Sequence, residues 1–231
     1  MNSQELQEEL RATIIDGDEA RATELAYESV GDPAGLPAVV QVAVDTIKLI
    51  GDRFGTGECF LPEMVLSAEA MLAFMHIASP HLEKATGKAS KAGKVVLGTV
   101  QGDIHTIGKD IVLTMLSASG FDVVDMGVDA SPIDVIKTAE QTRAQIIGLS
   151  ALMTTSMPYQ EETIALLREL GIRDKFWVMV GGGPVTVEYA RRIGADGWAP
   201  DAGTAVRVCE QLLAGGAKPG SGLVTGEGRT Q

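Results

Sequence analysis

The chain has 231 residues, a length that suits one large domain or two small ones. Hydrophobic residues make up 45% of it and charged residues 22%, which is enough apolar material to bury a core. The net charge of −12 disfavours binding to a phosphate backbone, so we expect no nucleic-acid partner.

Targeting and cysteine signals narrow the class of protein further. The sequence has no uninterrupted apolar stretch of about 20 residues, and residues 1–20 lack the basic start and apolar run of a signal peptide. The two cysteines, Cys59 and Cys209, have no CxxC spacing, which excludes a disulfide scaffold or a cysteine-based zinc site. We therefore expect an acidic cytoplasmic protein that does not bind membranes.

Residues 1–90 show helical periodicity only. Leu6, Leu10 and Ile14 recur every four residues in a first helix, which ends at a glycine-containing turn over 16–18. Further helices are predicted over 18–30, from about 37 to 54, and over 61–83. Four helices joined by short loops predict a small bundle.

The fourth predicted helix is rich in methionine. Leu61, Met64, Ala68, Met71 and Met75 fall on one stripe of it. The simpler interpretation is that this stripe forms the core of the bundle. The alternative is that part of it faces a large apolar ligand, because methionine adapts to irregular surfaces.

The period changes after a linker that we place over 85–93. Strands predicted over 94–100, 122–126, 146–150, 176–180 and near 198 alternate with helices over 107–119, 132–143, 159–170, 185–193 and 204–213. This alternation predicts a parallel sheet covered on both faces, which binds ligands at the carboxyl ends of its strands. We expect a helical domain over 1–90, an α/β domain over 91–214 and a flexible tail over 215–231.

The chemistry-bearing residues follow the first strand, where 99–110 read TVQGDIHTIGKD. This is neither the GxGxxG dinucleotide fingerprint nor a P-loop. An Asp-x-His tripeptide alone is more simply a helix cap beside an uninvolved histidine. Two other loops at the carboxyl ends of strands favour a functional site over this simpler interpretation. The third strand ends in SALMTTS over 150–156 and the fourth in GGG over 181–183.

The three-part pattern DxHxxG, SxL and GG resembles the cobalamin-binding module of methionine synthase and of the corrinoid proteins in methylamine, methanol and O-demethylase methyltransferase systems. The resemblance covers residues 1–214, with the stretch around 173–177 a residue or two longer than in methionine synthase. It implies an α/β protein with an N-terminal four-helix bundle cap and a C-terminal five-stranded parallel Rossmann-like (flavodoxin-like) cobalamin-binding domain.

The same resemblance implies a ligand set for the metal. His105 would be the axial ligand of cobalt, and imidazole suits such a metal. Asp103 would accept the other ring N–H of that histidine, which fixes its tautomer, and Ser156 would extend the relay. The cofactor would be cobalamin, as methylcobalamin or the Co(I) corrinoid, with its lower base displaced from cobalt by His105.

Cofactor contacts are implied in both halves of the chain. Glycines would let the backbone approach the nucleotide tail of the cofactor closely, hydroxyl side chains would line its slot, and apolar residues of the bundle would shield the cobalt. The residues concerned are Gly102, Ile104, Thr106, Gly108, Ser150, Leu152, Thr154, Gly181, Gly182 and Ala202 in the α/β half, and Phe54, Leu61 and Met64 in the bundle. The shielding residues must move aside for methyl transfer, with the linker as hinge.

The leading hypothesis is a corrinoid methyl carrier that is not catalytic alone. Its partners would be a substrate:corrinoid methyltransferase, a second methyltransferase that passes the methyl group to tetrahydrofolate, a related pterin or a thiol, and a reductive activase. The alternatives are a cobalamin subunit of a carbon-skeleton mutase and a cobalamin-dependent sensor. The helical half disfavours the mutase subunit, and no output element such as a helix-turn-helix supports the sensor. The sequence identifies neither the methyl donor, the docking surface, the oligomeric state nor the lower base.

Overall fold

The computed structural model describes residues 3–86, 92–215, 217–226 and 228–230, which form two compact units. The helical unit lies within residues 1–91, and the sheet unit comprises 92–116 and 121–231. The linker expected over 85–93 includes residues 87–91, which lie outside the described part of the chain.

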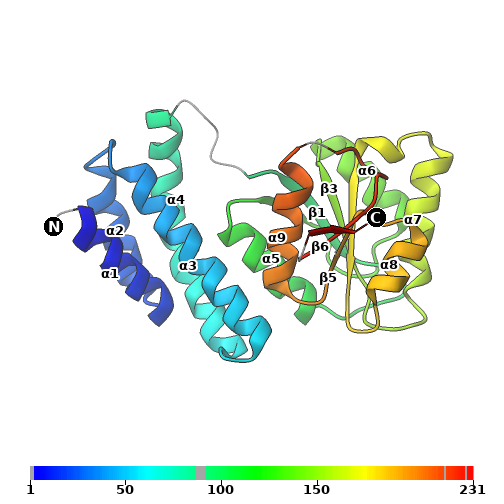
Figure 1. Ribbon diagram of the computed structural model, residues 1–231, viewed down its shortest axis with the longest axis horizontal. Helices are drawn as coiled ribbons and strands as arrows, with labels where there is room; N and C mark the ends of the chain where they lie inside the picture. The colour runs from blue at the N-terminus through cyan, green and yellow to red at the C-terminus, as the bar shows by residue number, and fades with distance from the viewer. Residues whose placement is uncertain (1–2, 87–91, 216, 227, 231) are drawn as a thin grey trace. The chain divides into compact units, whose positions relative to one another are not determined.

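The helical unit contains the four helices that the periodicity predicted. They are α1 (Ser3–Asp16), α2 (Glu19–Val30), α3 (Leu36–Thr56) and α4 (Leu61–Thr86), shown in blue to cyan-green in Figure 1. Short polar signals set their ends. The Asp18 carboxylate accepts the N–H of Arg21 at the start of α2, and Gly57 ends α3 in the left-handed conformation.

The core of the helical unit forms where α1, α2 and α3 pack against α4. Met64, Met71 and Phe74 of α4 are fully buried, together with Leu10 and Leu25 from the first two helices. Most of the methionine stripe is therefore bundle core, as the simpler interpretation held. The segment Leu61–Ala78 is also long and apolar enough to cross a membrane by length and composition, a test that core helices of this kind also pass.

The sheet unit contains a seven-stranded sheet in the order β2-β1-β3-β4-β5-β6-β7. Its strands are β1 (Lys94–Thr99), β2 (Asp122–Asp125), β3 (Ile146–Ser150), β4 (Trp177–Gly181), β5 (Gly197–Ala199), β6 (Leu223–Thr225) and β7 (Gly228–Thr230). The first six are parallel, and β7 pairs antiparallel to β6. The predicted Rossmann-like parallel sheet is confirmed, but it has six parallel strands where five were expected. Its strand order reverses between β1 and β3, which is where such sheets bind ligands.

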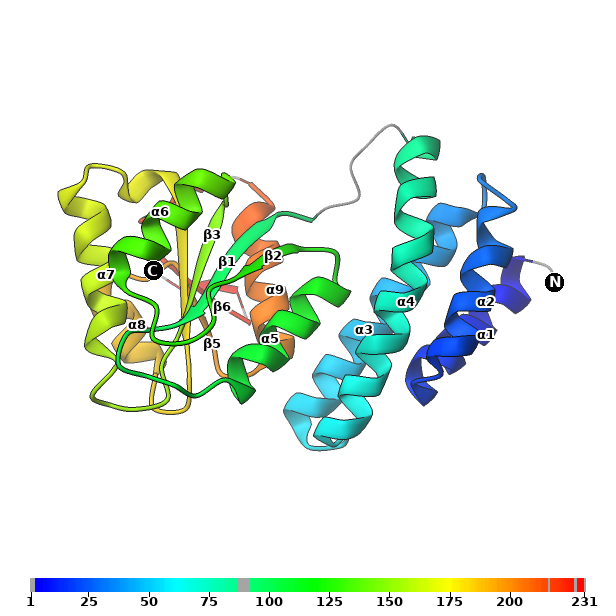
Figure 2. The ribbon, with the colours of Figure 1, turned by 180° about the vertical axis from the view of Figure 1, so that it is seen from behind.

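Five helices cover the two faces of this sheet. They are α5 (Ile107–Ala118), α6 (Pro132–Thr142), α7 (Pro158–Glu169), α8 (Val187–Ile193) and α9 (Ala202–Leu213). Helices α5 and α9 lie on one face and α6, α7 and α8 on the other, as Figures 1 and 2 show from opposite sides. The strands are buried on both faces, so they read as continuous apolar runs, such as Val95 to Leu97 in β1.

Strands β6 and β7 lie in the segment for which we expected a flexible tail, 215–231. Leu223 and Val224 are buried, and the Val224 N–H donates to the Asp196 carbonyl oxygen at 2.7 Å. The Gly220 N–H also donates to the Asp196 carboxylate. Strands of three residues among Gly, Ser and Lys have no periodicity to detect, and the residue that holds them lies far back in the sequence.

A close backbone approach shapes the carboxyl end of β4. Gly182 has φ +121°, and a Cβ atom there would lie 1.8 Å from the carbonyl oxygen of Ala151 in the loop after β3. Only glycine permits both the conformation and the contact.

We expect Gly182→Ala to lower the free energy of unfolding by more than about 2 kcal/mol, because it adds a backbone clash to left-handed strain. The matched control is Gly171→Ala, where φ is +68° but a Cβ atom would meet nothing within 4 Å. That variant should lose only about 1 kcal/mol. Denaturant unfolding of both variants measures the difference, and equal losses would contradict the close approach.

Candidate functional site

The loop between β1 and α5 carries the predicted metal ligand, and it is held by its own backbone and by one neighbouring loop. The Thr99 hydroxyl donates to the carbonyl oxygen of His105 at 2.9 Å. Gly102, in the left-handed region with φ +76°, donates its N–H to the Asp129 carboxylate at 2.7 Å. The Asp129 N–H in turn donates to the Asp103 carbonyl oxygen at 3.0 Å. The loop is therefore fixed before any ligand binds.

The Asp103 carboxylate is the centre of the site and is fully buried. Its Oδ1 lies 2.7 Å from His105 Nδ1 and accepts the His105 backbone N–H at 3.1 Å. Its Oδ2 accepts the Leu152 N–H and the Ser156 hydroxyl, both at 2.7 Å. Burial alone would raise the pKa of Asp103, but these hydrogen bonds together hold its pKa well below 3.8. The carboxylate is therefore ionised at neutral pH.

His105 faces outward from this carboxylate, with its side chain 47% exposed. Because an ionised carboxylate can only accept, Nδ1 carries the proton of the neutral ring and the lone pair lies on Nε2. The hydrogen bond to the carboxylate fixes this orientation of the ring, which leaves Nε2 on the side away from Asp103, as a metal ligand would require. In the described ranges there is no group of three or more His, Cys, Asp or Glu side chains that could hold a metal ion.

Apolar side chains surround His105 on the surface of the sheet unit. Ile104 and Ile107 are 75% and 69% exposed, and Leu152 of the neighbouring loop is also exposed. Exposed aliphatic side chains beside an imidazole that could bind a metal suit a flat, largely apolar ring with a metal at its centre. A single imidazole can hold such a metal, because the ring brings the other ligands.

The loops after β3 and β4 supply the remaining predicted contacts at this edge. Ser150 pairs with Gly181 across the two strands, and Thr154 lies exposed on the loop that Ser156 ends. Gly182 approaches that loop as described above. Ala202 is buried at the first position of α9, which follows β5, and Thr106 and Gly108 are exposed around the start of α5.

Sequence reasoning did not single out three residues of this edge. Ile107 extends the apolar surface, and Asp129 clamps the turn at Gly102. Gln160 is buried and its Nε2 donates to the carbonyl oxygens of Leu149 and Gly181, while its Oε1 has no partner in the part of the chain described. Such an orphaned acceptor between β3 and β4 is a further sign of a ligand group nearby. No local motif marks any of the three.

The predicted shielding residues lie in the helical unit. Leu61 is exposed at the start of α4, Phe54 of α3 is partly buried, and Met64 is fully buried. Their role toward a cofactor stays a prediction.

Comparisons with known proteins agree with this geometry. Models of two families, each described as a B12 binding domain, match residues 93–207 and 6–78, and so define a B12-binding protein. A corrinoid protein of Desulfitobacterium hafniense (strain Y51) is 42% identical over 90% of this chain and 97% of its own length. The trimethylamine corrinoid protein of Methanosarcina barkeri is 38% identical over 92% of this chain and 98% of its own length.

Solved structures agree as well. A cobalamin-binding protein from Desulfitobacterium hafniense DCB-2 superposes with a TM-score of 0.76 at 29% identity, over 90% of this chain and 98% of that one. The methanol:cobalamin methyltransferase complex MtaBC from Methanosarcina barkeri gives 0.76 at 26% identity, over 93% and 82%. The chain belongs to the cobalamin-binding corrinoid proteins of methyltransferase systems, and its cofactor is cobalamin. Both predictions are confirmed.

The hydrogen bonds to Asp103 should make Asp103→Asn destabilising by about 2 kcal/mol at pH 7, because an amide cannot accept all of them. Since the pKa of Asp103 is lower in the folded than in the unfolded chain, its contribution is present above pH 3.8 and is lost as pH falls further. The difference between wild type and variant should therefore shrink as the pH falls below 3.8, as measured by urea unfolding.

The matched control for that measurement is Asp129→Asn. Asparagine keeps the acceptor for the Gly102 N–H and tolerates the left-handed φ of +52° at this position. We therefore expect Asp129→Asn to lower the free energy of unfolding by no more than about 0.5 kcal/mol. If both variants lost the same free energy of unfolding, the hydrogen bonds to Asp103 would stabilise the fold no more than the one to Asp129.

Proposed function

We propose that this protein is a methyl carrier that binds cobalamin with His105 in place of the cofactor's own lower base. The observation that supports the proposal is the orientation of His105, whose Nδ1 lies on a buried carboxylate 2.7 Å away while Nε2 is open. The cobalt of cobalamin supplies the chemistry of accepting and donating the methyl group.

The residues of the chain then have separate tasks. His105 binds the metal through Nε2 and can take up a proton there when it is released. The charge of Asp103 stabilises the imidazolium that this produces, and Ser156 holds the second carboxylate oxygen in place. Release of the metal is in this way coupled to the uptake of a proton at His105 Nε2.

The displaced lower base needs a slot at the same edge of the sheet. We place it along the ends of β3 and β4, where Ser150 and Thr154 offer hydroxyl groups. Gly181 and Gly182 offer approachable backbone there. Buried Gln160 holds the ends of these two strands in place by donating to the carbonyl oxygens of Leu149 and Gly181. The slot for the lower base is completed by Gly102, Gly108, Thr106 and Ala202. Ile104 and Leu152 lie against the ring of the cofactor.

The helical unit protects the reactive face of the cofactor in this proposal. Phe54, Leu61 and Met64 are the residues assigned to that shield, and they must move aside when a partner enzyme attacks the same face. The match of the second B12 binding domain model to residues 6–78 supports a cofactor-related role for this unit. It also disfavours the alternatives of a mutase subunit and a sensor.

We further propose that the methyl donor carries its methyl group on nitrogen, as in a methylamine or a betaine. Relatives named for trimethylamine and dimethylamine are 38–46% identical to this chain, and among the solved structures a monomethylamine corrinoid protein is 34% identical, against 26% for the methanol complex. A substrate:corrinoid methyltransferase loads the carrier, and a second enzyme passes the methyl group to tetrahydrofolate, a related pterin or a thiol. A reductive activase restores a carrier whose metal has been oxidised.

Ligation by His105 has a direct spectroscopic test. Protein labelled with 15N-histidine and loaded with unlabelled Co(II) cobalamin should show two-line superhyperfine splitting in its electron paramagnetic resonance spectrum, because the axial nitrogen then has spin one-half. Three lines would mean that the cofactor's own base remains on cobalt. The variant His105→Ala should lose this nitrogen coupling, while His76→Ala, on an exposed position of α4, should keep it.

Methyl transfer itself tests the carrier role. With a methylamine methyltransferase and trimethylamine or a betaine, the reduced, cobalamin-loaded chain should be methylated, as followed by its absorbance spectrum. We expect His105→Ala to slow one complete cycle at least tenfold through weaker binding and control of the cofactor, with His76→Ala unchanged. Methylation only by a methanol system would contradict the proposed donor class but not the carrier role.

A further inference from the structure

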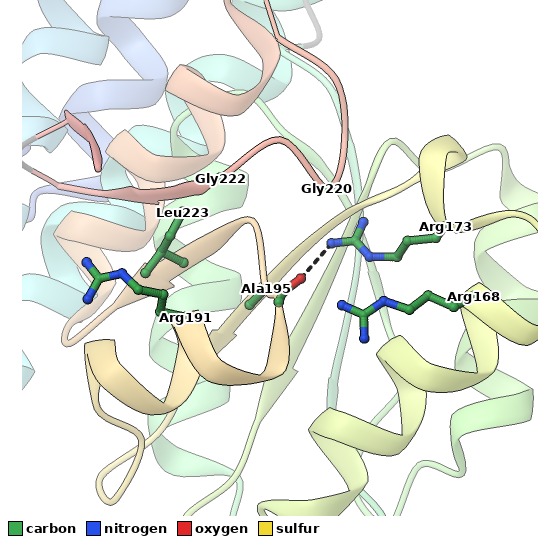
Figure 3. A pocket seen from close by; sticks show the side chains of 8 residues that line it. Arg168, Arg173, Arg191, Ala195, Gly220, Gly222 and Leu223 are labelled. Atoms are coloured by element: carbon green, nitrogen blue, oxygen red, sulfur yellow. Dashed lines mark hydrogen bonds between the residues drawn. The ribbon is translucent and has the colours of Figure 1, made fainter. Parts of the chain in front are cut away.

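A cavity lies in the sheet unit, away from the residues assigned to cobalamin. It has a volume of about 310 Å³, and Arg168, Arg173 and Arg191 line it. Figure 3 shows these side chains together with the C-terminal segment, of which Gly220, Gly222 and Leu223 form one wall. A cavity with three arginines is notable in a chain whose net charge is −12.

Strand direction places this cavity at the amino-terminal edge of the sheet. Arg173 precedes β4, Ala195 precedes β5 and Gly222 precedes β6. His105 lies beyond the opposite end of β1, at the carboxyl edge. Because a five-residue strand spans about 16 Å, a ligand in the cavity cannot touch the metal site. The matched family model also ends at residue 207, before the C-terminal wall.

The partners of Arg173 and Arg168 leave donors for a ligand. Arg173 donates to the Asp196 carboxylate at 2.7 Å and to the carbonyl oxygens of Phe176 and Gly194, but its buried Nε has no partner among the described residues. Arg168 donates once, to the Ile193 carbonyl oxygen at 3.2 Å, of the five N–H groups that a guanidinium carries.

The two guanidinium groups also lie close together. They donate to the carbonyl oxygens of consecutive residues, Ile193 and Gly194, and both face the cavity (Figure 3). Glycine at 194 makes room for them, because a Cβ atom there would lie 2.2 Å from Arg168 Nη2. Asp196 offsets one of the three positive charges that line the cavity. Arg168 has no carboxylate partner among the described residues, so its charge is available to an anion.

We propose that this cavity is a phosphate-binding site, which takes inorganic phosphate or the phosphate group of a small organic phosphate. Planar guanidinium groups bind phosphate oxygens through paired hydrogen bonds and carry the complementary charge. Because Gly220 and Gly222 form one wall, bound phosphate also holds strand β6 on the sheet. The site couples the C-terminal segment to the concentration of a phosphate compound.

Isothermal titration of the full chain with inorganic phosphate, at constant ionic strength set by potassium chloride, tests the site. We expect saturable binding, with the dissociation constant raised about tenfold or more in Arg168→Gln because charge-assisted hydrogen bonds are lost. The matched control is Arg192→Gln, which removes the same charge from the neighbouring helix α8 but does not line the cavity. Wild type and this control should bind alike.

Three outcomes would overturn the proposal. Phosphate could show no saturable binding, Arg168→Gln could bind as tightly as wild type, or loading with cobalamin could displace phosphate. The last result would make the cavity part of the cofactor site. Loss of stability in Arg168→Gln without an effect on phosphate would leave these arginines as caps of the α8 C-terminus, and would also refute the site.

Hydrogen exchange gives an independent measurement. Phosphate should slow the exchange of the amides of β6 in wild type and in Arg192→Gln, and not in Arg168→Gln, because binding stabilises the state that it recognises. Glycerol 3-phosphate in a parallel titration separates the two sources, since tighter binding than inorganic phosphate assigns an organic phosphate. Unchanged exchange at saturating phosphate would refute the coupling. Cobalamin-free protein suffices, so the result does not depend on the methyl-carrier role.

Discussion

The carboxylate of Asp103 is the interaction on which the carboxyl edge of this sheet depends. A buried charge is tolerated only when its hydrogen-bonding capacity is filled. Here His105 comes from the loop after β1, and Leu152 and Ser156 come from the loop after β3. These strands are neighbours at the point where the strand order reverses. Folding of the edge therefore also orients His105, the proposed metal ligand.

This arrangement divides the site into a rigid part and an open part. The buried part, from Asp103 to Ser156, contacts protein only, so it is complete before the cofactor arrives. The open part consists of His105 Nε2 and the aliphatic surface of Ile104 and Ile107. In the proposed carrier role this site holds the cofactor without contacting the methyl donor. We therefore assign donor specificity to a partner enzyme.

The sequence was informative where a feature is local or periodic. The four helices and five of the strands follow from apolar spacing, and Asp103 with His105 lies in a single short motif. Ser156 could be placed only by family resemblance, since 53 residues separate it from Asp103. Gln160 and strand β6 were missed because tertiary partners define them. Leu223 is buried only because Asp196 holds the segment that precedes it.

The parallel architecture also explains the charged residues at the ends of α7 and α8. Crossover helices direct their N-termini toward the carboxyl edge and their C-termini toward the amino edge, so acids are favoured at the first and bases at the second. Helix α7 has Glu161 in its first turn and Arg168 in its last, and α8 has Glu188 in its first turn and Arg191 and Arg192 in its last. Helix carbonyl groups therefore gather arginines at the amino edge whether or not a ligand is needed. They become a binding site only because a guanidinium has more N–H groups than those carbonyls can accept. Arg168, which donates to one carbonyl oxygen, is the side chain in which that surplus is largest.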